Sequence, residues 1–237
     1  MTKVIAINGS ARTEKGNTEL VLSSFLDGMR EAGASVEVVY AKKLKIRPCI
    51  GDFQCWYEKV GECIHSDDMQ PLLSKIRDAN ILVLATPVYL PLPGEFQNLL
   101  NRLMPICEPI LKFREGRTRI KFHDDVKVSQ IVLVSAGAWW ELGNLDTVVR
   151  IVKEFAEDVS VEFAGAILRP HAFLLSKFED QAEIIHDALK TAGNQLIIDG
   201  RISPNLFEII SKPLISEEEL RERYNQEYDD AKKRGLA

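Results

Sequence analysis

The chain has 237 residues, of which 46% are hydrophobic, and it carries a formal net charge of −5 with a pI near 5.5. This length and composition allow one large domain with a buried core, or one domain with an appendage. The acidic balance argues against a nucleic-acid binder, which usually carries a basic stripe.

Export and membrane insertion are not expected from the sequence. No stretch reaches the roughly 18 apolar residues of a membrane span, and Asn8 interrupts the first apolar run before it reaches signal-peptide length. We therefore expect a cytoplasmic protein with no membrane partner. Structural disulfides are rare in that compartment, so three clustered cysteines, Cys49, Cys55 and Cys63, indicate metal binding, redox chemistry or simple packing.

Two kinds of hydrophobic pattern alternate along the chain. Runs rich in β-branched residues predict buried strands, and apolar residues at helical spacing predict helices. The run "NILVLATPVY" is the most apolar of the strands and is stopped by Pro87. In chain order we expect strands at 3–7, 35–41, 80–89, 128–137 and 160–168, and helices at 18–33, 69–79, 94–106, 144–159 and 178–199.

Five strands that alternate with helices predict the fold class. Parallel strands need crossovers, and these are right-handed, so helices should cover both faces of one sheet. We expect an α/β fold, doubly wound, with a five-stranded parallel sheet in the flavodoxin-like order 2-1-3-4-5 across residues 1–200. Residues 201–237 are charged and helix-rich, which predicts a helical C-terminal extension that packs on the domain or at a subunit interface.

The loop after the first strand has the composition of an anion site. In sheets of this kind, ligands bind beyond the carboxyl ends of the strands, and this loop also opens a helix whose free N–H groups favour an anion. We expect a phosphate there, since the loop fits neither the P-loop nor the GxGxxG pattern. The alternative is a plain turn with a helix cap. The residues that would hold the anion are Ser10, Arg12, Gly16, Asn17 and Thr18.

The loops after the third and fourth strands supply apolar and small residues. The segment 86–96 contains three prolines, which pre-order a loop, and the backbone of Pro87, Val88 and Tyr89 is expected along the edge of a ring. The segment 135–144 holds two tryptophans between glycines. The alternatives are a rigid turn with Tyr89 on the core, and tryptophans that pack under the loop or at a subunit contact. A phosphate cradle beside a flat apolar slot matches FMN.

Two of these loops resemble those of a known family. The stretch "GSARTEKGNT" resembles the phosphate loop of the NADPH-dependent FMN reductases, and "TPVYLPLPGEFQNLLNR" resembles their second loop. In this resemblance Asn98 and Asn101 stand where lysine and aspartate are common. The resemblance implies that the first loop holds the FMN phosphate and that the second flanks the isoalloxazine. It further implies that the third loop reaches the pyrimidine side of the ring through Ser135, Ala136 and Gly137.

The same resemblance implies an activity. We expect an FMN-binding, NAD(P)H-dependent oxidoreductase that passes electrons from reduced nicotinamide through flavin to a small acceptor such as a flavin or quinone. A homodimer or homotetramer is implied as well. Flavin N5 carries the chemistry, so we nominate no catalytic acid or base, and the scattered histidines show no partner in the sequence. The alternatives are an electron carrier with an iron–sulfur cluster and a protein partner, and a non-catalytic FMN-binding protein.

The cysteine segment resembles the compact motif of the iron–sulfur flavoproteins, a subset of this superfamily. The spacing is Cys49-x2-Asp52-x2-Cys55-x7-Cys63, with aspartate in the place of the second thiolate. Since Fe–S clusters are normally held by four thiolates, we interpret the segment as a motif that no longer binds a cluster. The alternatives are an intact 4Fe–4S cluster with Asp52 or an outside ligand such as His65 or Cys107, and a zinc site, whose usual spacing differs.

Overall fold

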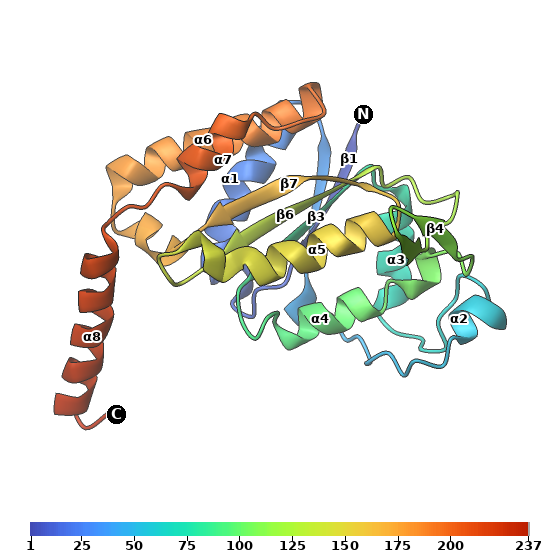
Figure 1. The fold of residues 1–237 in the computed structure, drawn as a ribbon, viewed down its shortest axis with the longest axis horizontal. Helices are drawn as coiled ribbons and strands as arrows, with labels where there is room; N and C mark the ends of the chain where they lie inside the picture. Colours follow the sequence, from blue (N-terminus) through green and yellow to red (C-terminus); the bar gives the residue numbers. More distant parts are fainter. Residues whose placement is uncertain (237) are drawn as a thin grey trace.

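The structure, a computed structural model, describes residues 1–236 and is built on one five-stranded parallel sheet (Figure 1). The spatial order is β2-β1-β3-β6-β7, which is the predicted order 2-1-3-4-5 when only the strands of this sheet are counted. The fold class expected from the sequence is therefore confirmed. The strands are β1 (Lys3–Asn8), β2 (Ser35–Tyr40), β3 (Ile81–Pro87), β6 (Gln130–Ala136) and β7 (Glu162–Arg169).

Helices cover both faces of the sheet, and each face has its own apolar core (Figure 1). β1, β3 and β6 are almost wholly buried, as expected for strands covered on both sides. One face is covered by α1 (Asn17–Glu31), α6 (Glu179–Ile198) and α7 (Pro204–Ser211), and the other by α3 (Met69–Asp78), α4 (Gly94–Asn101) and α5 (Asp146–Asp158).

Short elements fill the connections. A one-turn helix, α2 (Gln54–Tyr57), lies within the cysteine segment, where the sequence shows no clean period. The helix expected at 94–106 is too long: α4 ends at Asn101, and a separate turn follows around Pro105, which lacks the N–H that would continue a helix. The 3-10 turns are Thr13–Lys15, Ala41–Lys43, Met104–Ile106, Leu142–Leu145 and Ala172–Ser176.

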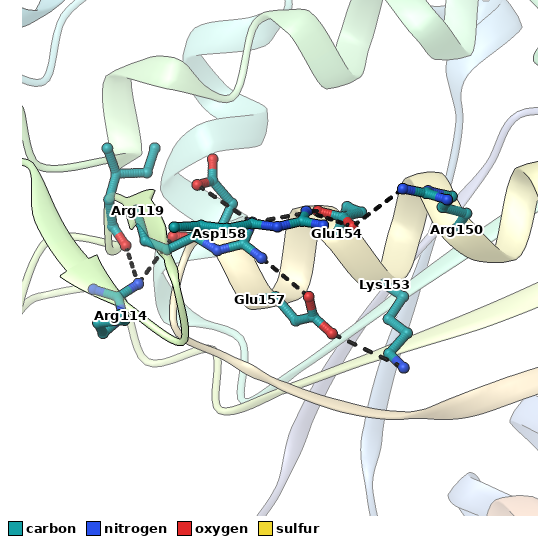
Figure 2. Close-up of polar contacts among 9 residues, drawn as sticks. Arg114, Arg119, Arg150, Lys153, Glu154, Glu157 and Asp158 are labelled. Atoms are coloured by element: carbon teal, nitrogen blue, oxygen red, sulfur yellow. Dashed lines mark hydrogen bonds and ion pairs between the residues drawn. The ribbon is translucent and has the colours of Figure 1, made fainter.

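A small antiparallel hairpin, β4 (Lys112–Arg114) and β5 (Arg117–Arg119), was not predicted, because three-residue charged strands carry no hydrophobic period. Figure 2 shows how side chains attach it to the last turns of α5. Arg117 pairs with Glu154 at 2.7 Å, and the buried Arg119 pairs with Glu157 at 3.1 Å. Cations at a helix C-terminus also meet the negative end of its dipole, so charge rather than apolar contact holds the hairpin.

The C-terminal extension has two parts. α7 buries Leu206 and Ile210 in the core beneath β7 and α6. α8 (Glu217–Lys233) begins where the Ser216 hydroxyl accepts a hydrogen bond from the amide of Glu219 at 3.1 Å, and its far end projects away from the body (Figure 1). Within residues 1–236, no helix combines the length and apolar character needed to cross a bilayer.

Candidate functional site

The three loops singled out from the sequence meet at one edge of the sheet, because β1, β3 and β6 are neighbours. Main-chain hydrogen bonds join each loop to the next strand or loop. Their relative positions are therefore fixed by backbone geometry and depend little on individual side chains. The bonds run from Gly9 N to Ala85 O at 2.7 Å, from Val88 N to Ala136 O at 3.2 Å, and from Gly137 N to Arg169 O at 2.9 Å.

The first loop closes tightly on itself. The backbone amide of Ser10 donates to Asn8 Oδ1 at 2.8 Å, and the Asn8 amide group donates to Glu19 at 2.7 Å. A Cβ atom at Gly16 would lie 2.4 Å from the Ser10 hydroxyl oxygen, so a larger residue there would have to displace this hydroxyl. Burial raises the pKa of Glu19, against the lowering effect of its hydrogen bond from Asn8. A chain of contacts from α1 through Asn8 thus fixes the loop.

The helix that follows this loop begins without a side-chain cap. Gly16 is the N-cap residue of α1 and offers no side chain to the amides of the first turn. Ser10 and Thr18 are buried beside that turn, while Arg12 is exposed. Uncapped amides at a helix start are donors available to an anion. The geometry of the loop therefore agrees with the phosphate interpretation.

The second loop leaves β3 and presents Tyr89 to solvent. The Tyr89 side chain is 51% exposed, and its backbone amide donates to Pro91 O at 2.7 Å. Tyr89 therefore does not cap the core, which was the alternative considered for it. Pro87 and Val88 are half-buried and lie at the carboxyl end of β3.

The third loop places main-chain groups at the edge of the sheet, whereas the hydroxyl of its Ser135 points into the sheet. The Ser135 hydroxyl is buried and donates to Thr86 O at 3.0 Å, inside the sheet. Trp139 is 56% exposed and lies 5.3 Å from the Tyr224 ring of α8. The Trp140 indole donates to Ile215 O at 2.9 Å, which ties the loop to the C-terminal extension. The two tryptophans and α8 line a cavity of about 290 Å³.

Beside the third loop lies a buried pair that sequence reasoning missed. Arg169 is fully buried, and its guanidinium donates to Ile210 O and Lys212 O, both at 2.7 Å, at the end of α7. His171 Nε2 lies 3.2 Å from Arg169 Nη2 and accepts the amide of Leu214 at 3.1 Å. Burial, followed by the charge of Arg169, lowers the pKa of His171 to about 4. No sequence signal links these two residues to the extension.

The cysteine segment forms a second, separate site. Cys49, Asp52, Cys55 and Cys63 line one cavity of about 160 Å³ with an almost wholly apolar lining. Burial raises the pKa of Cys55, and the negative charges of Cys63, Cys49 and Asp52 raise it further, so the four groups are within electrostatic reach of one another. The residues that the motif resemblance brought together in sequence are therefore also together in space.

A buried ion pair contributes one residue, Arg102, to the wall of this cavity. Arg102 is 1% exposed, and its guanidinium donates to both oxygens of Asp67, at 2.8 and 3.1 Å. Asp67 also accepts the backbone amides of Arg47 at 2.9 Å and Met69 at 3.1 Å. The bond to Met69 lies at the start of α3. The pairing with Arg102, 35 residues away, was missed.

Of the two outside ligands considered for a cluster, His65 lies at the cysteine cavity and Cys107 does not. His65 lines the same cavity, and its Nε2 atom lies 3.2 Å from Pro48 O. Cys107 is buried elsewhere, and burial raises its pKa to about 12. Asn101 lines the cavity, whereas Asn98 donates to Ile46 O at 2.7 Å. In residues 1–236, no three His, Cys, Asp or Glu side chains are grouped as a site for a metal ion.

Comparison with known proteins gives the sequence relatives. A family model described as NADPH-dependent FMN reductase matches residues 2–118. An iron–sulfur flavoprotein of Methanocaldococcus jannaschii is 32% identical over 153 residues, which cover 65% of this chain and 70% of the relative. An iron–sulfur flavoprotein of Archaeoglobus fulgidus is also 32% identical, over 48% of this chain and 51% of the relative.

Solved structures share the fold at low identity. An FMN-dependent NADH-azoreductase from Bacillus anthracis, in complex with FMN, superposes with a TM-score of 0.61 at 15% identity and covers 83% of this chain and 100% of its own. An NAD(P)H:quinone oxidoreductase from Methanothermobacter marburgensis gives a TM-score of 0.54 at 14% identity, over 82% and 96%.

Fold and loops together define a protein of the flavodoxin-like class, with three joined loops at the carboxyl edge of the sheet. The chain belongs to the FMN reductase-like family that includes the iron–sulfur flavoproteins. The predicted family, an oxidoreductase family that uses FMN and a reduced nicotinamide, is thereby confirmed.

Proposed function

We propose that the three joined loops bind FMN and that the protein transfers electrons from NAD(P)H through it to a small acceptor such as a flavin or quinone. The observation that carries this proposal is the uncapped start of α1 in a loop tied by backbone bonds to its neighbours. Bound FMN would supply an N5 atom that accepts a hydride from the nicotinamide.

The roles of the chain's residues follow from their places. Ser10, Asn17 and Thr18 would surround the phosphate at the start of α1, with Gly16 leaving room for the Ser10 hydroxyl. Arg12 is exposed at the loop surface and would meet the phosphate as a cation. Pro87, Val88 and Tyr89 would lie along the ring, and Ser135, Ala136 and Gly137 would offer main-chain groups to its pyrimidine side.

A glycine substitution tests this proposal. Gly16→Ala places a Cβ atom 2.4 Å from the Ser10 hydroxyl oxygen and should displace the phosphate loop. Gly143→Ala is the matched control, since its Cβ atom meets nothing nearer than 3.8 Å. We expect at least a tenfold loss of FMN affinity for the first variant only, measured by flavin fluorescence. A natural protein that takes up no FMN, or flavin that NAD(P)H does not bleach, would overturn the proposal.

We propose as a second function that of an iron–sulfur flavoprotein, in which the cysteine cavity holds a cluster that exchanges electrons with the flavin and a protein partner. The specific observation in its favour is the convergence of three thiols and a carboxylate in one cavity. Each iron of a cubane takes one protein ligand, so the four groups need not crowd around a single ion as zinc ligands do. The donor set and the apolar lining fit such a group, with Asp52 as the harder fourth ligand.

Iron and sulfide analysis separates this function from the first. Protein purified without oxygen and reconstituted with ferrous iron and sulfide should contain both in near-stoichiometric amount, beside the flavin bands. Asp52→Cys completes the thiolate set and should make the cluster more resistant to air. If only Asp52→Cys takes up iron, the segment is a motif that no longer binds a cluster in the natural protein.

A further inference from the structure

Arg102 keeps part of its hydrogen-bonding capacity unused at the wall of the cysteine cavity. Its Nη1 atom donates to Arg47 O at 2.6 Å and to Asp67, and its Nη2 atom donates to Asp67. The Nε atom is buried and has no partner. A buried, unpartnered N–H of a charged group is costly, so its presence beside a cavity points to an acceptor that belongs there.

The cavity itself indicates which acceptor would be suitable. Arg102 and Cys63 line the same cavity. Two hydrogen bonds join Arg102 to the Asp67 carboxylate, and a guanidinium remains protonated in proteins. The guanidinium therefore stays charged and faces a space where negative sulfur would lie.

We propose that Arg102 is a positioning residue that stabilises the negative charge of an iron–sulfur cluster held by Cys49, Asp52, Cys55 and Cys63, and that Asp67 sets the strength of this effect. The proposal rests on the second function above. It goes further by naming the residues that control the cluster's reduction potential.

The net charge of the cluster explains why a nearby cation should change its reduction potential. An oxidised 4Fe–4S core carries two positive charges, so four anionic ligands give a net charge of about −2, which becomes about −3 on reduction. The one electron would come from reduced flavin, and no bond between the protein and the cluster would form or break. A fixed, buried cation beside the cluster would favour the more negative state, as would hydrogen bonds to the sulfur atoms.

The Asp67 carboxylate should shift the reduction potential in the direction opposite to that of Arg102. Its carboxylate is 6% exposed and holds the guanidinium by two hydrogen bonds, so it both orients Arg102 and offsets its charge. Removal of the carboxylate's charge should leave Arg102 uncompensated and favour the reduced cluster. Removal of the guanidinium's charge should favour the oxidised cluster.

A redox titration of the reconstituted protein tests these opposite signs. The natural protein and each variant are loaded anaerobically with ferrous iron and sulfide, and the midpoint potential is followed by electron paramagnetic resonance. We expect Arg102→Gln to lower the potential, Asp67→Asn to raise it, and Arg102→Lys to stay nearer the natural value than Arg102→Gln. Arg119→Gln is the control, since Arg119 is also buried and ion-paired but packs on α5.

The outcomes decide the proposal in each case. Shifts of Arg102→Gln and Asp67→Asn in the same direction, or no shift in either, overturn it. If Arg102→Gln does not fold or load, a raised potential in Asp67→Asn supports the proposal, and an unchanged or lowered one overturns it. A natural protein that assembles no cluster also overturns it, while the flavin bands of the same sample show independently whether the FMN function stands.

Discussion

The two candidate sites are built in different ways. At the carboxyl edge of the sheet, the three loops are joined by main-chain hydrogen bonds, and two glycines, Gly9 and Gly16, permit the close approach. The cysteine cavity is instead lined by side chains, among them Arg102, which pairs with Asp67. The first site depends on topology, and the second depends on one ion pair between segments distant in sequence.

This contrast predicts different sensitivities to substitution. Backbone bonds survive most side-chain changes, so the edge should tolerate them except where a new atom has no room. A buried ion pair fails when one partner is removed, because the other is left charged in a dry site.

The largest expected effect is on the ion pair in the absence of metal. Asp67→Ala leaves Arg102 buried and unpaired, and we expect a loss of about 3–5 kcal/mol in the free energy of unfolding. Urea denaturation of the metal-free protein measures this. Asp78→Ala, at an exposed aspartate paired with Lys127 at 2.5 Å and with Lys3, should change stability little because solvent screens both pairs. Equal losses in the two variants would contradict the importance given to burial.

A smaller effect is expected at the edge of the sheet. Gly9→Ala would place a Cβ atom 2.5 Å from the Phe96 ring, and such overpacking costs about 1–3 kcal/mol. Because Gly9 also bonds to Ala85, the displacement should weaken FMN uptake as well. Urea denaturation and flavin fluorescence measure the two effects. An unchanged variant would show that Phe96 moves aside without cost.

The same contrast explains what could be predicted from the sequence. Strand order follows from alternating patterns and right-handed crossovers, so the meeting of the first, second and third loops could be predicted before any coordinates. Arg102 and Asp67 could not, because no local pattern pairs two residues that are separated by two helices and a strand. In the sequence, Arg102 is a polar residue at the end of a helix, a position that is usually exposed. Only the tertiary fold shows that it is buried.

Other contacts that the sequence did not predict also join residues that are distant in the chain. Arg169 and His171 come together with the end of α7 across 41 to 43 residues, and the hairpin at 112–119 is held by ion pairs with α5. Both depend on long-range polar contacts, which hydrophobic periodicity does not report. The thiols of the cysteine segment, in contrast, lie within 15 residues of one another, and the resemblance to the iron–sulfur flavoprotein motif grouped them as one set.

Lowering the pH should destabilise the two sites over different pH ranges. The pKa of His171 is lowered in the folded protein to about 4 from 6.5, so its contribution to stability is complete above about pH 6.5 and is lost as the pH falls toward 4. His186, whose pKa burial also lowers, acts in the same direction from α6. The pKa of Asp67 is lowered by Arg102 and backbone hydrogen bonds, which outweigh burial, so its contribution is lost only below about pH 4.

The three tryptophans allow each site to be observed separately. Trp56 donates to Met104 O at 3.1 Å beside the cysteine cavity, while Trp139 and Trp140 belong to the edge. In Trp56→Phe, the emission should change between pH 6.5 and 4, and His171→Gln should reduce that change. In a variant that keeps only Trp56, the change in emission should begin at a lower pH. One common midpoint for both variants would mean that the sites unfold as a unit.

The smallest effect is expected from the surface pairs near the first loop. Lys42 lies 2.5 Å from Glu95, and Lys43 pairs with Glu14, which links the turn after β2 to the edge of the sheet. Both side chains of the first pair are about half exposed, so solvent and salt screen them. We expect Glu95→Gln to change the free energy of unfolding by less than about 1 kcal/mol, and the difference should vanish in high salt. A larger, salt-independent loss would show that the edge is held by side-chain charge, as the cysteine cavity is, and would remove the contrast between the two sites.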